Sequence, residues 1–247
     1  MNPLELAAAR SAWAHRNVGE KALLFIGSAL LAVALPPIPG LPLLTTVIIG
    51  SVLRAHIPLK LYLRVCFAPM SFIIVGTLPL LLSITTRGVE LHVSQWDQAA
   101  TVVARSCVAT SAVIAFAFTT PMAEIIAWSV HIGMPTSLVY VVTAMYRMIN
   151  TLMTTARTMW EAQAMRRGHS SLRRWMGSVA AQAASLFIIA FDRARRLSEG
   201  LELRADRTAL LVAHPRRQAH RGRLGCYSAA LIVITALCFL YYSPPPL

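Results

Sequence analysis

The chain has 247 residues, of which 56% are hydrophobic and 13% are charged, and its mean hydropathy is +0.60. This composition excludes a soluble globular domain and predicts an integral membrane protein with room for about five or six spans. The net charge of +13 does not indicate nucleic-acid binding, because the basic residues lie between apolar runs and form no basic domain interleaved with aromatic side chains.

Apolar runs of membrane-spanning length occur throughout the chain. The charge-free run at residues 22–53 is too long for one span and is interrupted by the sequence PPIPGLP, which predicts two short or tilted spans joined at residues 36–42. Further spans are expected at residues 65–84, 98–120 and 226–242. We therefore predict an all-α integral membrane protein with about five transmembrane helices, and with long cytoplasmic helices between the fourth and last spans.

Most of the charge lies between the fourth and last spans. Residues 157–223 contain 14 of the 23 basic residues and five acidic ones. The positive-inside rule therefore places this segment in the cytoplasm, with the N-terminus on the same side and the C-terminus outside. The chain is expected to have three parts: a membrane domain of four spans (1–120), a cytoplasmic or interfacial coupling domain (121–224), and the last span with its tail (225–247).

Two long helices are expected in the middle part, at about residues 135–168 and 178–204. The first alternates a polar and an apolar stripe at helical spacing, and Pro135 and Gly168 suit its first turn and its C-terminal cap. Both helices end in arginine-rich tips, which is typical of a docking surface. Small and apolar residues recur along the second helix and predict a seam that packs against the first, at Val179, Ala183, Leu186, Ala190, Leu197 and Leu201.

We expect no catalytic or metal-binding residues in this chain. The four cysteines lie in or beside apolar runs without CxxC spacing, and the seven histidines are scattered without an HxH or HxxxH pattern. The spans hold almost no acidic residues, which argues against an intramembrane protease or transferase. The chain also lacks the GxxxxGK[ST] phosphate loop, so it is not expected to bind ATP in that way or to carry a cofactor.

Several motifs together resemble a known family. The sequence TTPMAEIIAW precedes a GMP step, YRMI follows it, and the first long helix ends in EAQAMRRG. This text, with two long helices that end around an arginine, resembles the transmembrane T component of energy-coupling factor (ECF) transporters, the CbiQ/EcfT family. The resemblance extends over about residues 12–204. The central arginine is the one residue of the Ala-Arg-Gly signature that is kept at both places, since the chain has Arg166-Arg167-Gly168 at the first and Leu203-Arg204-Ala205 at the second.

The resemblance implies a non-catalytic coupling subunit of a bacterial plasma (inner) membrane importer. Residues 166–168 and 203–205 would dock on two copies of an ATP-binding cassette subunit, which bind and hydrolyse ATP. The motion would pass to a separate integral membrane subunit that captures the substrate. An arginine at each tip would form a charge-assisted pair with a carboxylate of the ATP-binding subunit.

The cargo and the class of function each leave an alternative. The sequence HIPLKLYLRVCFAPMSFIIVG resembles the metal-importing group and favours cobalt, with nickel or a vitamin such as biotin as alternatives. A self-contained secondary carrier or a membrane scaffold is the alternative of another class, because the chain has no ATP site of its own.

Overall fold

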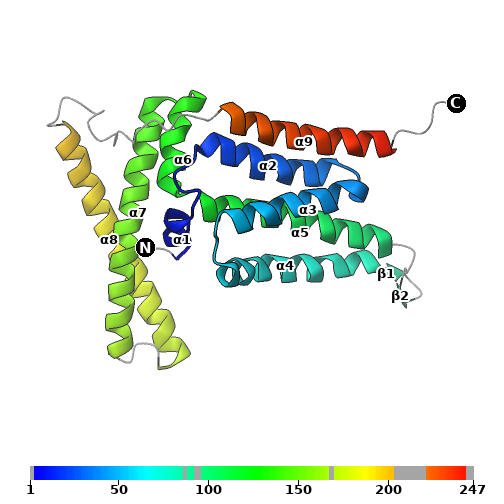
Figure 1. The fold of residues 1–247 in the computed structure, drawn as a ribbon. Helices are drawn as coiled ribbons and strands as arrows, with labels where there is room; N and C mark the ends of the chain where they lie inside the picture. The colour runs from blue at the N-terminus through cyan, green and yellow to red at the C-terminus, as the bar shows by residue number, and fades with distance from the viewer. Residues whose placement is uncertain (1–2, 86–87, 92–95, 167–169, 203–220, 243–247) are drawn as a thin grey trace. The chain divides into compact units, whose positions relative to one another are not determined.

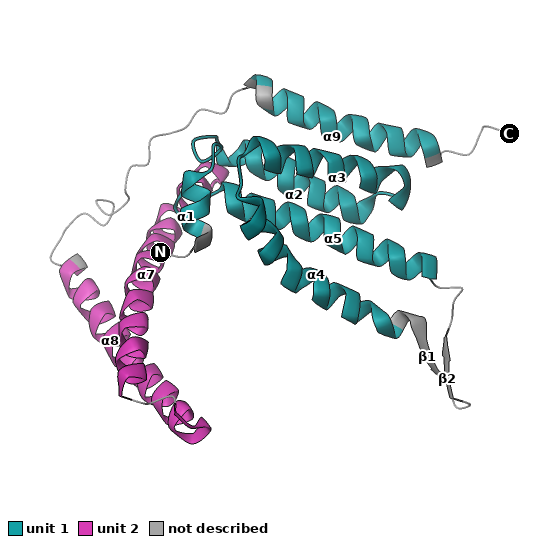
Figure 2. Cartoon of the chain, turned by 60° about the horizontal axis from the view of Figure 1, so that its bottom comes forward, with its two compact units in different colours: residues 1–125, 215–247 teal, residues 126–214 magenta. Residues whose placement is uncertain are grey.

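The structure, a computed structural model, describes residues 3–85, 88–91, 96–166, 170–202 and 221–242 (Figure 1). The chain divides into two compact units (Figure 2). Unit 1 consists of residues Met1–Ile125 and Pro215–Leu247, and unit 2 of residues Ile126–His214.

Helices make up nearly all of the described chain, and they confirm the predicted all-α membrane fold. Unit 1 contains α1 (Pro3–Arg10), α2 (Val18–Ala34), α3 (Pro37–Arg54), α4 (Leu59–Leu81), α5 (Trp96–Thr119) and α9 (Arg221–Tyr242). The short helix α6 (Met122–Ser129) spans the boundary between the units, and unit 2 continues with the 3-10 turn η2 (Val130–Ile132), α7 (Thr136–Met165) and α8 (Leu172–Glu202).

The described residues also contain a short hairpin that the sequence did not predict. Strands β1 (Leu82–Thr85) and β2 (Gly88–Leu91) pair antiparallel, with Leu82 opposite Leu91 and Thr85 opposite Gly88. The hairpin follows directly on α4, so this helix ends at Leu81 and the predicted third span, 65–84, ends too late. Such a two-stranded pair does not alter the helical class of the fold.

Helix α5 is the centre of unit 1, since it contacts α1, α2, α3 and α4. Its residues Ala112, Ala115 and Phe118 are fully buried, and Phe25 of α2 and Leu44 of α3 join the same core. The two alanines let neighbouring helices approach closely, while the phenylalanines fill the space between them. Because lipid tails are as apolar as these side chains, the packing stabilises membrane helices chiefly through van der Waals contacts.

The predicted pair of short spans at residues 22–53 corresponds to α2 and α3. Helix α2 ends where the N–H of Leu35 donates to the carbonyl of Leu31 at 2.9 Å. Helix α3 begins at Pro37, although Ile38 has extended φ and ψ values of −115° and 127°. Proline lacks the N–H that a first turn leaves unpaired, so these prolines end one helix and start the next.

Helix α2 begins at Val18, four residues before the predicted span. The Asn17 side chain accepts a hydrogen bond from the N–H of Gly19 at 2.8 Å, which caps the helix earlier than the apolar run suggests. The two charged residues Glu20 and Lys21 therefore lie inside the first turn of α2.

Five of the described helices are long and apolar enough to cross a membrane: α3, α4, α5, α8 and α9. Helix α2 has only 17 residues and is not among them. Helix α8 is among them, whereas the positive-inside rule predicts a cytoplasmic position for residues 178–204. Length and composition therefore permit a span there, and the cytoplasmic position of α8 stays a prediction.

Unit 2 is built around its two longest helices. Gly133 has a φ of +92°, a conformation that glycine adopts without a steric penalty, and it ends the 3-10 turn before α7. Helix α7 has 30 residues and α8 has 31. The latter starts at Leu172, six residues before the predicted start, because the hydroxyl of Ser171 accepts a hydrogen bond from the N–H of Arg174 at 3.4 Å.

Candidate functional site

Helices α7 and α8 form a crossed, antiparallel pair (Figure 1). The side-chain amide of Gln163 donates to the carbonyl of Ser178 at 3.1 Å, and that of Gln182 donates to the carbonyl of Ala156 at 2.8 Å. The residue number falls along α7 as it rises along α8, which defines the antiparallel direction. Each helix thus extends one glutamine side chain to the backbone of the other.

The face of α8 that packs on α7 lies about one residue before the predicted seam. Leu186 and Ala190 are partly buried as predicted, but Val179, Ala183 and Leu197 are exposed. The glutamine bonds explain the difference, because they require Ser178 and Gln182 to face α7. The partly buried side of α8 consists of Ser178, Gln182, Leu186, Ile189, Ala190, Arg193 and Gly200.

Exposed arginines lie at the end of α7 and at the start of α8, and we call these described residues, Arg166, Arg173 and Arg174, the cationic tip. Arg166 is the C-cap of α7, and its backbone N–H donates to the carbonyl of Ala162 at 3.3 Å. The residue is exposed. At the start of α8, Arg173 and Arg174 are exposed, and Arg174 donates to the hydroxyl of Ser170 at 2.9 Å. The sequence has no Asp or Glu between residues 162 and 191. The adjacent residues of the sequence therefore supply no carboxylate that would compensate the positive charge of this tip.

The other end of α8 carries charges of both signs. Arg196 is 3.0 Å from a carboxylate oxygen of Asp192, and Arg195 is 3.0 Å from one of Glu199. Both pairs are exposed and four residues apart on the helix, so each contributes only about 0.3–0.5 kcal/mol. A helix of 31 residues is about 46 Å long. The two ends of α8 therefore lie far apart, with the Arg166 tip at one of them.

The structure reaches only one of the six predicted docking residues. Arg166 is described and exposed. Arg167, Gly168, Leu203, Arg204 and Ala205 lie outside the described residues, although α7 and α8 are described up to the residues directly before each group. The docking role of all six stays a prediction. The antiparallel pairing adds that the two groups follow opposite ends of the helix pair.

Unit 1 contains a buried charged cluster that the sequence did not predict. Lys21 is 1% exposed; its Nζ donates to the carbonyl of Thr119 at 2.9 Å and lies 3.6 Å from Oε2 of Glu124. Glu20, also 1% exposed, precedes it in α2. The signal was an adjacent acid and base before an apolar run, together with one acid in the apolar helix α6. The cluster joins the start of α2 to the turn between α5 and α6.

Metal-ligating side chains are scattered in the described part of the chain. No group of three or more His, Cys, Asp or Glu that could hold a metal ion occurs among the described residues. Cys66, Cys107, Cys226 and Cys238 are free thiols, and the first and last of these are buried. Cys66 and Cys238 pack as small apolar side chains in the core of unit 1.

Comparison with known proteins identifies the family. The cobalt transport protein family CbiQ matches residues 10–205. The chain is also 35% identical over 202 residues to the cobalt transport protein CbiQ of Rhodobacter capsulatus, which covers 81% of this chain and 83% of the relative. The region matched by the family, residues 10–205, contains α2 to α8, and hence the helices of unit 1 other than α1 and α9 together with the long helix pair. The prediction of family is thereby confirmed, and the chain belongs to the CbiQ family of cobalt transport proteins.

Proposed function

We propose that this chain is the non-catalytic coupling subunit of an ECF-type importer. The ends of α7 and α8 dock on two ATP-binding subunits, and the helix pair transmits their movement to an integral membrane subunit that captures the substrate. Arg166, Arg167 and Gly168 form one docking end, and Leu203, Arg204 and Ala205 form the other. ATP is bound and hydrolysed in the partner subunits.

The observation that carries this proposal is the antiparallel pairing of two helices of about 30 residues each. Their C-terminal ends point in opposite directions, so two separate partner subunits can each contact one end. A straight helix is stiff over this length and moves as a unit when one end is displaced. The glutamine bonds between α7 and α8 couple a displacement of one helix to the other.

The charge of the Arg166 tip supports a carboxylate-bearing partner. An arginine that binds a carboxylate in a buried interface forms two parallel hydrogen bonds of fixed geometry. The connection contains several arginines and no acidic residue between 162 and 191. It therefore offers cations that no neighbouring residue of its own sequence neutralises.

The family supports a proposal for the cargo, and the charge distribution supports one for the sidedness. Membership of the CbiQ family favours cobalt over nickel or a vitamin. The excess of basic residues at 157–223 favours a cytoplasmic position for the helix pair and the N-terminus, and an external C-terminus. The setting is the bacterial plasma (inner) membrane.

The test is a pull-down of the ATP-binding subunits by the detergent-solubilised chain, with cobalt uptake measured in the same cells. Loss of one buried charge-assisted contact costs roughly 2–5 kcal/mol, which corresponds to at least about 30-fold weaker binding. Arg167→Glu should reduce binding more than Arg167→Ala, because it places two carboxylates together. The double variant Arg167→Ala/Arg204→Ala should release the ATP-binding subunits.

A matched control is Arg157→Ala, which removes an exposed arginine from the middle of α7 and should retain binding and uptake. Undiminished pull-down and uptake in the double variant would refute the docking role. Transport by the chain alone in liposomes would instead support a self-contained carrier.

A further inference from the structure

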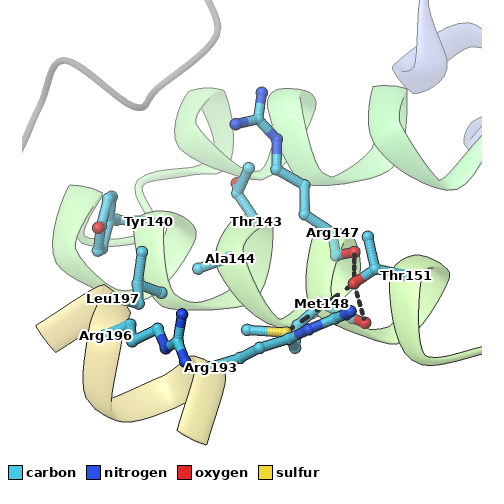
Figure 3. A pocket seen from close by; sticks show the side chains of 9 residues that line it. All are labelled: Tyr140, Thr143, Ala144, Arg147, Met148, Thr151, Arg193, Arg196 and Leu197. Atoms are coloured by element: carbon cyan, nitrogen blue, oxygen red, sulfur yellow. Dashed lines mark hydrogen bonds between the residues drawn. The ribbon is translucent and has the colours of Figure 1, made fainter. Parts of the chain in front are cut away.

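We infer that unit 2 contains a binding site for the phosphate headgroup of an anionic membrane lipid. The site is a cavity of about 450 Å³ between α7 and α8, in the size range of small-molecule sites (Figure 3). The side chains that line it combine cations, hydroxyls and apolar groups: Tyr140, Thr143, Ala144, Arg147, Met148, Thr151, Arg193, Arg196 and Leu197. It lies between the first half of α7 and the C-terminal part of α8, and it includes none of the proposed docking residues.

The three arginines of the cavity differ in how far their charge is already compensated. Arg196 pairs with Asp192 at 3.0 Å. Within the described parts of the chain, Arg147 and Arg193 have no carboxylate within salt-bridge distance. Arg193 is partly buried, and a partly desolvated cation is stabilised by a bound anion.

Figure 3 shows how these cations can meet one ligand. The Arg193 side chain extends from α8 toward α7, and Arg196 projects from the same helix. The Arg147 side chain extends from α7 away from α8, but it is exposed, so its long stem can turn toward a bound anion. An arginine presents several N–H groups in one plane, which suits the oxygens of a phosphate.

The hydroxyl groups of the cavity leave one donor for the ligand. The Thr143 hydroxyl donates to the carbonyl of Val139 at 2.7 Å, and that of Thr151 donates to the carbonyl of Met148 at 2.8 Å. The hydroxyl of Tyr140 is buried and has no hydrogen-bond partner among the described residues. A buried polar group without a partner is unfavourable, so a ligand that accepts its hydrogen bond is stabilised there.

The apolar part of the lining favours a lipid over a free anion. Ala144, Met148 and Leu197 form apolar walls, which a phosphate ion alone does not contact favourably. Met145 and Ile149 directly follow Ala144 and Met148 in α7, and both are exposed. In the inferred site they provide apolar surface for the acyl chains. A basic pocket between helices of a membrane protein, with apolar surface beside it, is a setting in which anionic headgroups bind.

The test uses the full chain in mild detergent and measures bound lipid by native mass spectrometry. We expect dioleoyl phosphatidylglycerol to be retained in preference to dioleoyl phosphatidylcholine. The variant Arg147→Gln/Arg193→Gln should retain roughly 30-fold less phosphatidylglycerol, the combined effect of two lost cations. The matched control Arg157→Gln/Arg195→Gln removes one arginine from each helix outside the cavity and should retain it within about twofold. Equal loss in both variants would overturn the site.

Two further measurements keep the inference testable if the cavity variant does not fold. A photoactivatable phosphatidylglycerol should crosslink the wild-type chain within residues 140–151 and 193–197; crosslinks elsewhere alone would overturn the inference. Added inorganic phosphate at millimolar concentration should not displace the lipid. Displacement by phosphate would show an anion site without lipid specificity, and so contradict the assignment.

Discussion

The two units differ in the size of their buried cores, although exposed phenylalanines such as Phe67 and Phe72 occur in unit 1 as well. In unit 1, Phe25 and Phe118 are completely buried, whereas in unit 2 Phe187 is 71% exposed and stacks on Phe191, which is 67% exposed. Among the described residues of unit 2, the buried apolar side chains are Ile126 and Val139. Unit 1 thus has a core of its own, while α7 and α8 retain apolar surface. Such surface marks contact with a partner or with lipid.

The helices of the two units are held together by different kinds of contact. Unit 1 packs five long helices through small residues and aromatic rings. Unit 2 joins two helices through glutamine side chains bound to backbone carbonyls. We expect substitutions to have larger effects on stability in unit 1 than in unit 2, and the following predictions test that difference from the largest effect to the smallest.

The largest effect is expected at the buried lysine of unit 1. Lys21→Ala removes the cation beside Glu124 and the donor to Thr119, and breaking a buried pair costs about 3–5 kcal/mol. Thermal unfolding of the chain in detergent should show a large decrease in midpoint. The exposed Lys60→Ala is the control and should change little.

A double variant separates the charge effect from packing. Lys21→Met/Glu124→Leu removes both charges and should be less destabilised than Lys21→Ala, because no carboxylate then lacks its partner. If the single and double variants unfold alike, the pair does not stabilise unit 1.

The close approach of α2 and α9 predicts that a larger side chain at Gly27 destabilises unit 1. A Cβ atom at Gly27 of α2 would lie 3.0 Å from Cδ1 of Leu231 in α9, and Leu231 is buried. Gly27→Leu should therefore destabilise unit 1 by roughly 1–3 kcal/mol through overpacking. Gly50→Leu is the matched control, because a Cβ there meets no described atom within 4 Å. Comparable unfolding midpoints for the two variants would contradict the close packing of α2 on α9.

A smaller effect is expected from the glutamine bonds of unit 2. Gln182→Ala removes the hydrogen bond to the carbonyl of Ala156, a contribution of about 1 kcal/mol. Hydrogen–deuterium exchange in α7 and α8 should become faster, while exchange in α5 stays unchanged. Asn150→Ala, at an exposed position of α7, serves as control. Unchanged exchange in both long helices would mean that the glutamine bonds do not hold the pair together.

The smallest effect is expected on the exposed face of unit 2. Phe187→Ser should change the free energy of unfolding by no more than about 0.5 kcal/mol, since the side chain is exposed. The contrasting substitution Phe25→Ala, in the core of unit 1, should cost about 3–5 kcal/mol. Urea titration of both variants measures the difference. A large loss at Phe187 would show that unit 2 has a packed interior, and would end the distinction between the units.

Hydropathy predicted the membrane helices because an apolar run of about 20 residues is a local signal. The two helices of residues 18–54, α4, α5 and α9 all lie within a few residues of their predicted spans. The helix starts were predicted less well, since they depend on the capping side chains Asn17 and Ser171. The β1–β2 hairpin was missed because four-residue strands leave too short a pattern.

Long-range contacts explain what else the sequence could not predict. Lys21 looks like a charge at the end of a span, and its burial depends on Thr119 and Glu124, far along the chain. The packing face of α8 depends on which backbone carbonyl Gln182 meets on α7. The tip at Arg166 was located from local pattern alone, since arginines at a helix end are visible in the sequence.

The hydrogen bond from Lys21 to the carbonyl of Thr119 means that the last turn of α5 is neutralised by a different helix. The boundary of α5 is thus encoded partly in α2, about a hundred residues earlier. Chimaeras between members of this family must therefore exchange residues 18–34 together with residues 119–124. A graft that transfers only one of these segments would leave a helix terminus, or a buried ammonium group, without its counterpart.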